Sequence, residues 1–390
     1  MPLSRRQFCT AAASALAATR LPAQQQPTSR PDVASIDHDR ILAAADHALT
    51  QPVTPLTALP APHALGTPNE FFSHTDEPAA ASAAEAPPFT AHRDALLALT
   101  LAVPALTSAW LITRTADPTR ASTYARQAAL HLRSWFITPS TRMDPSLNFA
   151  AAAPSTGGHP EGTAETSAFA EIAQSVPFLI RAEALSPEDL AALKAWFAAF
   201  LKWLTTSRLA GLARDRKDHV ASSWLLQTTA YARLTADDTA LAELRHHFKT
   251  VTLRAQILAD GTFPHELTTP IPFRNSLFNL DLLAAACDLL STRFENLWDF
   301  QLQDGPGLRV AVARHAPFIE NRGAWPYRAD AHLFNDLPCR RPALLFAARA
   351  YGRPEYATIW RGLNPDPANP DILRTFPIRQ PILWVTRPQP

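Results

Sequence analysis

Apolar residues recur at intervals of three and four positions along most of this chain from Phe89 onward. Such spacing gathers apolar side chains on one face of an α-helix, whereas the strict alternation that is typical of β-strands is scarce. Prolines interrupt the pattern at short intervals. The pattern therefore predicts helices near residues 91–115, 119–135, 164–184, 187–206, 220–234, 237–258, 276–293, 305–319, 338–350 and 353–362.

Two of these helices begin with recognisable start signals. Ser186 precedes Pro187 and two acidic residues, and Asp117 precedes Pro118. Each pair offers an N-cap side chain followed by a proline in the first turn, where its missing N–H is tolerated.

Helices joined by short turns pack most simply as antiparallel hairpins. No strict repeat of about 34 or 40 residues is present, which disfavours a simple solenoid. We therefore expect an all-α fold, an incomplete α/α barrel (toroid) of antiparallel helical hairpins. In such a ring the inter-helix loops at one end line a cleft, where aromatic side chains suit flat sugar faces.

The N-terminus predicts a transport signal rather than part of the fold. Arg5 and Arg6 stand in the pattern S-R-R-x-F ahead of a weakly apolar, Ala-rich run. This pattern is typical of twin-arginine export, so we expect a signal over residues 1–23 and a periplasmic or secreted protein.

The remaining chain divides by composition. Residues 24–60 form a Pro- and Ala-rich segment with one predicted helix over 34–49, and residues 61–88 predict an extended arm. The main domain is expected to span residues 61–390.

Composition narrows the class of protein. The 390 residues are 47% hydrophobic, with 36 Lys and Arg against 35 Asp and Glu, which excludes a disordered chain and disfavours a dedicated nucleic-acid binder. No run of 18 apolar residues occurs, so membrane insertion is not expected.

The sequence contains no GxGxxG, GxxxxGK[ST], HExxH, CxxC or GxSxG motif. We expect Cys287 and Cys339 to be buried free thiols.

Two non-helical segments carry the first candidate groups. Residues 141–166 form a Gly-rich loop that holds His159, Glu161 and Glu165 ahead of a helix; the alternative is a solvated loop with capping residues. Residues 214–227 place Asp218, His219 and Trp224 at a helix start; the alternative is Asp218 as an N-cap with His219 in the first turn.

Two further segments follow. Residues 260–283 contain the Pro-interrupted loop with His265, Glu266, Arg274 and Asn275, where the alternative is Asn275 or Ser276 as an N-cap and Arg274 in solvent. Trp325, Tyr327 and Arg328 stand together after a glycine, where exposed aromatic side chains beside a cation suit an acidic sugar and a packing role at the edge of the core is the alternative.

In this order, the segments resemble the alginate-lyase-like family of polysaccharide lyases from about residue 61 to about residue 362. The matching stretches are PHALGTPNEFFS (62–73), FTAHRDAL (89–96), LRSWFITPSTRMDPSLNFAAA (132–152), SPEDLAALKAWFAAFLKWLTTS (186–207), DGTFPHEL (260–267), SLFNLDLL (276–283), WPY (325–327) and RPEYATIW (353–360).

The resemblance implies β-elimination at a uronic acid. In the family, an Asn-His pair and an Arg neutralise the sugar carboxylate, a basic residue removes the C5 proton, and a Tyr or the His protonates O4 of the leaving sugar. No metal or organic cofactor is required. The expected partner is an acidic polysaccharide or oligosaccharide.

The family's Asn-His segment differs in this chain. The family pattern KNNHxTxWxxQ aligns without gaps with KDHVASSWLLQ, residues 217–227, which puts Asp218 and His219 at the two Asn positions and Val220 at the His. A slip of one residue would instead keep Asp218 and His219 as the Asn-His pair, but it misplaces Trp224 and Gln227, so the gapless alignment is preferred.

Other working positions are replaced as well. The family's Arg and Tyr become Thr269 and Asn275, with Arg274 adjacent as a substitute cation. In the Gly-rich loop, an Arg becomes His159 and an Asp becomes Glu165. We therefore expect a rebuilt site.

Its expected catalytic residues are His219, Asp218, Arg274 and Asn275. Its expected substrate-binding residues are His159, Glu165, Trp224, His265, Glu266, Trp325, Tyr327 and Arg328.

Two other functions stay open at this point. A hydrolase on the same scaffold requires two carboxylates about 6.5–9.5 Å apart for inversion, and its candidates are Glu161, Glu165, Asp218 and Glu266. The other is a catalytically inactive, polysaccharide-binding member, which the replaced Arg and Tyr favour.

Overall fold

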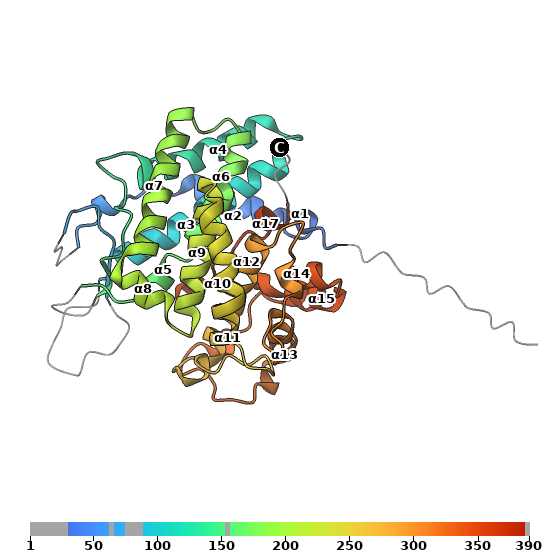
Figure 1. Cartoon of the computed structure of the whole chain (residues 1–390). Coiled ribbons are helices and arrows are strands. Elements are labelled where there is room, and N and C mark those ends of the chain that lie inside the picture. Colours follow the sequence, from blue (N-terminus) through green and yellow to red (C-terminus); the bar gives the residue numbers. More distant parts are fainter. Residues whose placement is uncertain (1–29, 62–65, 75–88, 153–156, 387–390) are drawn as a thin grey trace, which may run out of the picture.

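The computed structural model describes residues 30–61, 66–74, 89–152 and 157–386, which are predominantly helical (Figure 1). The predicted all-α class is confirmed. The predicted export signal over residues 1–23 lies outside the described residues.

The elements follow the predicted order. The first are α1 (Val33–Ile36), α2 (His38–Thr50), β1 (Phe72–His74), α3 (Ala91–Thr113), α4 (Pro118–Leu132) and β2 (Phe149–Ala152). The middle ones are α5 (Gly162–Glu165), α6 (Phe169–Arg181), α7 (Pro187–Thr206), α8 (Arg208–Arg214), α9 (His219–Thr235), α10 (Asp238–His247) and α11 (Leu253–Gln256). The last are α12 (Pro272–Leu290), α13 (Leu308–Glu320), α14 (Pro342–Tyr351), α15 (Pro354–Gly362), α16 (Pro370–Leu373) and α17 (Ile382–Val385).

Capping side chains begin the helices as the sequence predicts. The Ser186 hydroxyl accepts the Asp189 N–H at 3.1 Å, and the Asp189 carboxylate accepts the Ser186 N–H at 3.4 Å, which makes a capping box at α7. Asp117 accepts the N–H of Arg120 at 3.0 Å at the start of α4.

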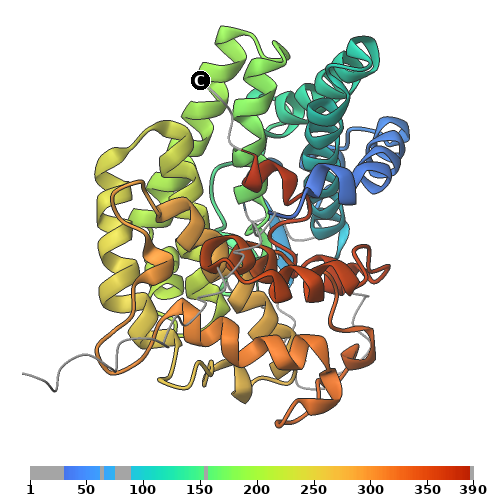
Figure 2. The ribbon, with the colours of Figure 1, turned by 90° about the vertical axis from the view of Figure 1, so that its right-hand side faces the viewer.

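The helices form two layers around a ring. Helices α3, α6, α9, α12 and α14 bury most of their surfaces and contact one another in that order, while α2, α4, α7, α10, α13 and α15 pack outside them. Figure 2 shows the chain running round the molecule, from blue through green and yellow to orange, before its red C-terminal segments return to the middle. This is the predicted incomplete α/α toroid.

Helix α3 is apolar on nearly every side. By length and composition it could cross a membrane, but 83% of its most apolar window is buried inside the protein. Burial of this extent is that of a core helix, since a helix that is apolar all round needs apolar neighbours on every face.

A two-stranded parallel sheet was not predicted. Strand β1 pairs with β2, with Phe72 opposite Phe149 and His74 opposite Ala152. Both strands are short and β2 is Ala-rich, so neither carries a recognisable alternating pattern. Buried His92 of α3 supports β1, because its Nδ1 accepts the Phe72 N–H at 3.0 Å and its Nε2 donates to the Leu59 carbonyl at 2.8 Å.

Several predicted boundaries need correction. The helix predicted over 164–184 is broken between α5 and α6, where the Thr166 hydroxyl donates to the Gln227 side chain of α9 instead. The helix predicted to begin at 276 begins at Pro272, because Asp330, from a distant loop, caps it by accepting the N–H groups of Phe273 and Arg274 at 2.7 and 3.0 Å.

A buried carboxylate joins the C-terminal segment, which carries α16 and α17, to the inner ring. Glu171 of α6 accepts the N–H groups of Arg379 and Gln380 at 2.9 and 2.8 Å. Burial raises the pKa of Glu171 to about 7, because its effect outweighs that of these hydrogen bonds.

Cys287 and Cys339 are buried free thiols, as predicted.

Replacing Glu171 by Gln should remove one source of pH dependence in stability. The folded protein binds this proton more tightly than the unfolded chain does, so the group's stabilisation is complete below an ordinary pKa of 4.5 and is lost as pH rises through about 7. Urea unfolding at several pH values should show a smaller fall in unfolding free energy for Glu171→Gln than for the native protein. The exposed Glu243→Gln on α10 serves as the control, and an equal fall in all three proteins would contradict the assignment.

Candidate functional site

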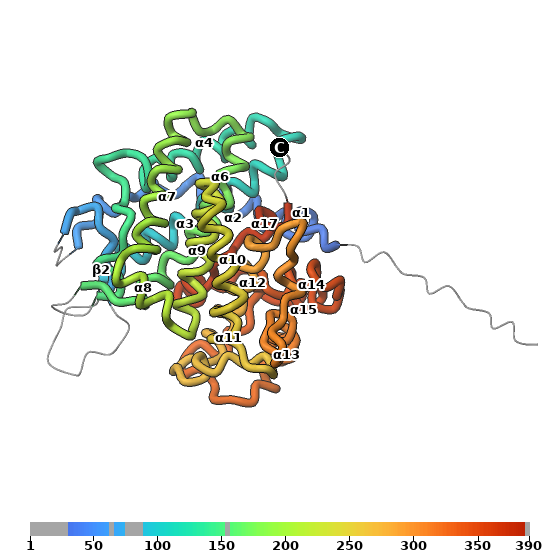
Figure 3. The backbone as a smooth tube through the Cα atoms, viewed as in Figure 1, coloured from blue at the N-terminus to red at the C-terminus, as the bar shows by residue number. Residues whose placement is uncertain are grey.

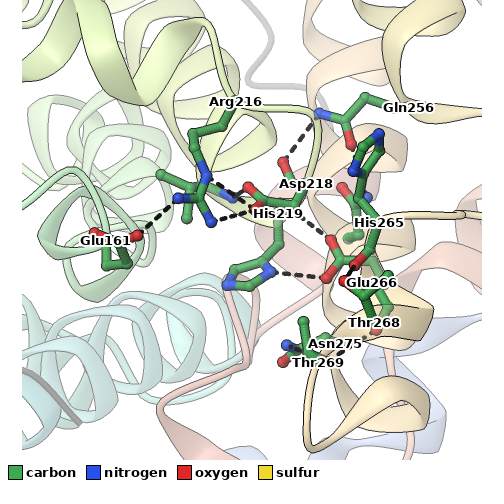
Figure 4. Close-up of polar contacts among 12 residues, drawn as sticks. Glu161, Arg216, Asp218, His219, Gln256, His265, Glu266, Thr268, Thr269 and Asn275 are labelled. Carbon is green, nitrogen blue, oxygen red and sulfur yellow. Dashed lines mark hydrogen bonds and ion pairs between the residues drawn. The ribbon is translucent and has the colours of Figure 1, made fainter. Parts of the chain in front are cut away.

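Several of the predicted polar residues meet at one end of the inner ring. The N-termini of α9 and α12 lie there, with the loop before α5 and the 3₁₀ turn Glu266–Thr268 (Figure 4). Figure 3 shows the backbone between α11 and α12 running beside the loop between α13 and α14 at this end, where the Ala331 N–H donates to the Pro270 carbonyl at 2.9 Å. Loops from distant parts of the sequence thus surround the site.

The carboxylate of Glu266 is fully buried and holds His219 through two hydrogen bonds. Its Oε1 accepts the backbone N–H of His219 at 2.5 Å, and its Oε2 lies 3.0 Å from the ring Nδ1. His219 is the first residue of α9, so the carboxylate also lies at a helix N-terminus, where unsatisfied N–H groups favour negative charge.

This contact fixes both the tautomer and the orientation of the His219 ring. An ionised carboxylate only accepts hydrogen bonds, so Nδ1 carries the proton and Nε2 of the neutral ring is the acceptor. In Figure 4 one ring nitrogen faces Glu266 and the other points away from it. The side chain is 19% exposed, and its ring packs near that of Phe278.

Electrostatics favour the charged form of the ring. Burial alone lowers the pKa of His219, but the Glu266 carboxylate outweighs it, so the pKa lies above the ordinary value of 6.5. The ring is therefore a base that keeps its proton to a higher pH than an ordinary histidine does.

A guanidinium group stands beside this pair. Arg216 donates through Nε and Nη2 to one oxygen of Asp218, at 3.0 and 2.6 Å, and through Nη1 to Glu161 at 2.8 Å. The other Asp218 oxygen accepts the Val220 N–H at 3.1 Å, so the alternative of Asp218 as an N-cap, with His219 in the first turn, is what the structure has. The Arg216 side chain is 42% exposed, which leaves the cation accessible to a ligand.

Buried amides hold the start of α9 in place. Gln256 donates to the Asp218 carbonyl at 3.0 Å and to the Ser222 hydroxyl at 2.9 Å, and its own carbonyl oxygen accepts from Asn279 at 2.9 Å. This network joins α11, α9 and α12, so the position of His219 is set by three helices.

The two replaced positions after Glu266 contact each other. Asn275 donates to the Thr269 hydroxyl at 3.2 Å, and that hydroxyl donates to the Glu266 carbonyl at 2.8 Å. Arg328 donates to the Thr269 carbonyl at 2.6 Å. The predicted residues Asn275 and Arg328 are therefore linked to the Glu266 turn.

The Gly-rich loop contributes a second acidic group. Glu165 accepts from the Ser73 hydroxyl at 2.8 Å and lies 3.6 Å from the Nε of Arg93 on α3. The backbone N–H of His159 donates to the Ala150 carbonyl of β2 at 2.9 Å. These residues are held by the small sheet and α3.

Several predicted residues take packing positions instead. Trp224 is buried, its indole N–H donates to the Leu204 carbonyl at 2.8 Å, and its ring contacts His247. Trp325 is buried against Phe273, which agrees with the alternative of a packing role at the edge of the core.

The remaining predicted residues also have defined places. The Tyr327 hydroxyl accepts from Arg314 at 2.9 Å, and His265 is exposed next to Glu266. Arg274 is buried in the first turn of α12, with Nη2 3.0 Å from Nε2 of His332, so the alternatives of a solvated Arg274 and an Asn275 or Ser276 cap are wrong.

Arg216 and Gln256 were missed by sequence reasoning. Arg216 precedes the Asp218 cap by two residues in R-D-R-K-D-H, and that proximity was the available signal. Nothing in the sequence marked Gln256 as functional, because it lies near the end of a predicted helix. Among the described residues, no group of three or more His, Cys, Asp or Glu side chains is placed to hold a metal ion.

Comparisons with known proteins agree with this architecture. A sequence model of the alginate lyase family matches residues 28–325. The crystal structure of an alginate lyase from Bacteroides ovatus superposes with a TM-score of 0.75 at 20% identity, over 91% of this chain and 94% of that one. A search of curated proteins finds no match.

Replacing Glu266 by Gln should lower the pKa of His219, because the Glu266 carboxylate is the main charge that opposes the effect of burial on the ring. Histidine NMR titration measures this, with the His219 signal assigned by its loss in His219→Ala. The control is Glu295→Gln, which removes a carboxylate that pairs with Lys249 rather than with His219.

The raised pKa of His219 also makes the stability of the fold depend on pH. Because the folded pKa of His219 is raised, this group stabilises the fold fully below pH 6.5 and less as pH rises through the folded value, and Glu266→Gln should weaken that loss of stability. A His219 pKa that does not change in Glu266→Gln would contradict the pairing.

Proposed function

This chain belongs to the alginate lyase family, and on that premise we propose that it is an exported polysaccharide lyase that cleaves a uronate-containing, alginate-like polymer by β-elimination. The observation that carries the proposal is the His219–Glu266 pair, which presents an oriented imidazole at the end of the ring where the loops gather.

His219 is proposed as the general base. The proton on Nδ1 is held by Glu266, so Nε2 accepts the C5 proton of the uronate. The resulting imidazolium is stabilised by the adjacent carboxylate, which therefore acts as a positioning and electrostatic group rather than as a reacting one.

Arg216 is proposed to neutralise the substrate carboxylate. The C5 proton becomes acidic only when the negative charge that develops on the carboxylate is stabilised, and a guanidinium N–H makes a charge-assisted hydrogen bond to a carboxylate oxygen. Arg216 is partly exposed and lies two residues from the Asp218 cap. Substrate would take the place of Glu161 on Nη1, while Asp218 keeps hold of Nε and Nη2.

The leaving oxygen needs a proton, and His219 supplies it in this proposal. The C5–H bond breaks to Nε2, the C4–C5 double bond forms, the C4–O4 bond breaks, and the proton passes from Nε2 to O4. Asn275 stands where the family has its Tyr, and an amide has no proton to transfer at neutral pH. One residue thus serves as base and then as acid.

The hydrolase alternative has less support. Glu161 and Asp218 both bind Arg216, and Glu266 binds His219. Glu165 lies beside Arg93 and accepts from Ser73. A hydrolytic pair needs one carboxyl group that stays protonated, and a neighbouring cation opposes that state.

Incubation with alginate, polymannuronate, polyguluronate and glucuronan tests the proposal through the ultraviolet absorbance of the new C4–C5 double bond. Native protein should produce this band, and His219→Ala should lower kcat by about 10²–10⁴. Activity should rise with pH as His219 loses its proton. In Glu266→Gln that rise should occur at lower pH with a smaller maximal rate, whereas Glu295→Gln should match the native protein.

The same assay separates the alternatives. Release of reducing ends without the band would establish hydrolysis, and binding by calorimetry without either product would establish an inactive binding member. Both results would overturn the lyase proposal.

Export is tested separately. We expect the protein in the periplasmic or extracellular fraction of a bacterium that has the twin-arginine pathway. Conservative replacement of both Arg5 and Arg6 by Lys should keep it in the cytoplasm, because the pathway recognises the arginine pair. Export that persists in the double variant and in a strain without the pathway would contradict this route.

A further inference from the structure

A second concave surface lies at the end of the ring opposite the candidate functional site. It is an open groove of about 590 Å³ between the C-terminal ends of α3 and α6 and the first turns of α4. This volume is within the range of about 300–1,000 Å³ that small-molecule sites occupy. None of the residues assigned to the candidate site lines the groove.

The course of α3 places this groove far from the candidate site. Arg93, in the first turn of α3, lies 3.6 Å from Glu165. Glu161 stands shortly before Glu165 in the same loop and binds Arg216 of the candidate site. The N-terminus of α3 is therefore at the site end of the ring. Arg114 follows the last residue of this 23-residue helix, so about 35 Å of helix separates the groove from the site end.

Two exposed arginines in the groove are available to bind an anion. Arg114 and Arg181 both line it, and both are exposed. In the described part of the chain, neither guanidinium group forms a hydrogen bond or an ion pair. By contrast, the nearby Arg120 of α4 pairs with Asp46 at 2.7 Å. The charges of the two groove arginines are therefore not neutralised by a carboxylate in contact.

The ring of Trp110 holds one of these cations in place. The guanidinium carbon of Arg114 lies over that ring, 5.4 Å from its centroid, within the range of a cation–π interaction. Trp110 itself is buried and lines the groove. Stacking over a ring leaves the N–H groups at the edge of the guanidinium plane available to a carboxylate. A side chain that is already ordered also loses less conformational entropy when a ligand binds.

The other polar groups of the wall suit a sugar acid better than a simple anion. Thr115 adds an exposed hydroxyl group, and Glu183 adds an exposed carboxylate. A carboxylate repels a simple anion, but it accepts hydrogen bonds from the hydroxyl groups of a sugar. Two arginines against one glutamate still leave the groove with an excess of positive charge.

We propose that this groove is a second binding site for the uronate polymer, separate from the site of cleavage. Arg114 and Arg181 bind sugar carboxylates, and Glu183 and Thr115 bind sugar hydroxyl groups. The identity of the polymer rests on the proposed function, whereas binding in the groove requires no cleavage. A long polymer held here has its other segments at a raised concentration around the ring, so the groove favours long substrates over short fragments.

Binding of alginate to the full protein carrying His219→Ala tests the proposal without cleavage. In that background, Arg114→Gln combined with Arg181→Gln should weaken alginate binding by about tenfold or more, because charge-assisted hydrogen bonds are lost. Electrophoresis in alginate-containing gels measures this. The control is Arg361→Gln, which removes an exposed arginine from the last turn of α15, outside the groove, and should leave binding unchanged.

A second variant blocks the groove and keeps both arginines. Ser122→Trp places a ring at an exposed position of the groove wall and should also weaken alginate binding, whereas Thr119→Trp, exposed on the same helix outside the groove, should not. Alginate binding that neither the double arginine variant nor Ser122→Trp weakens would overturn the proposal. So would an equal loss of binding to polyglutamate in the double variant, because polyglutamate has carboxylates but no hydroxyl groups.

Kinetics on the protein with His219 intact give a further readout. The double arginine variant should raise KM for long alginate with kcat unchanged, and should leave KM for short oligosaccharides unchanged, because tethering needs a molecule that reaches both sites. An unchanged KM for long alginate would overturn the role of the groove. If the native protein forms no unsaturated product, the proposed function alone fails, because the binding tests do not depend on cleavage.

Discussion

A negative charge buried at the start of a helix governs this molecule's candidate site. Glu266 has no exposed surface, and its carboxylate is compensated by the N–H and ring of His219 at the N-terminus of α9. Burying a lone carboxylate costs several kcal/mol or more, so the turn that carries Glu266 is stable only when it is docked on α9. The same contact that joins the α11–α12 loop to the ring therefore orients the imidazole.

Capping by distant side chains recurs through the second half of the ring. Asp330 caps α12 from the loop between α13 and α14, and Asp281 of α12 accepts the N–H of Ala343 at 3.1 Å near the start of α14. Asp281 also pairs with buried Arg341. Each inner helix here begins where another part of the chain supplies an acceptor, so the loops that surround the site are also the loops that order the helices.

The sequence predicted the parts of this structure that depend on local order. The 3.6-residue period located the inner and outer helices, and Ser186, Asp117 and Asp218 were identifiable as caps because a cap acts within its own turn. The His219–Glu266 pair joins residues 47 positions apart, and no local rule selects that partner from the other carboxylates. Trp224 was assigned to the substrate from its place in a matching segment and Trp325 from its residue type, yet only the fold shows that both are buried. The β1–β2 pair was missed because strands of three and four residues are too short to show a period of two.

The docking of the C-terminal segment has a consequence for how the chain reaches this state. Arg379 donates to the Thr100 carbonyl across 279 residues, and Arg40 of α2 donates to the Arg379 carbonyl across 339. Hairpins such as α3–α4 need only short loops to close, whereas these contacts require the ends of the described chain to meet. The topology therefore predicts that helical hairpins form before the ring closes, and that α3 gains its last apolar neighbours only when the C-terminal segment docks.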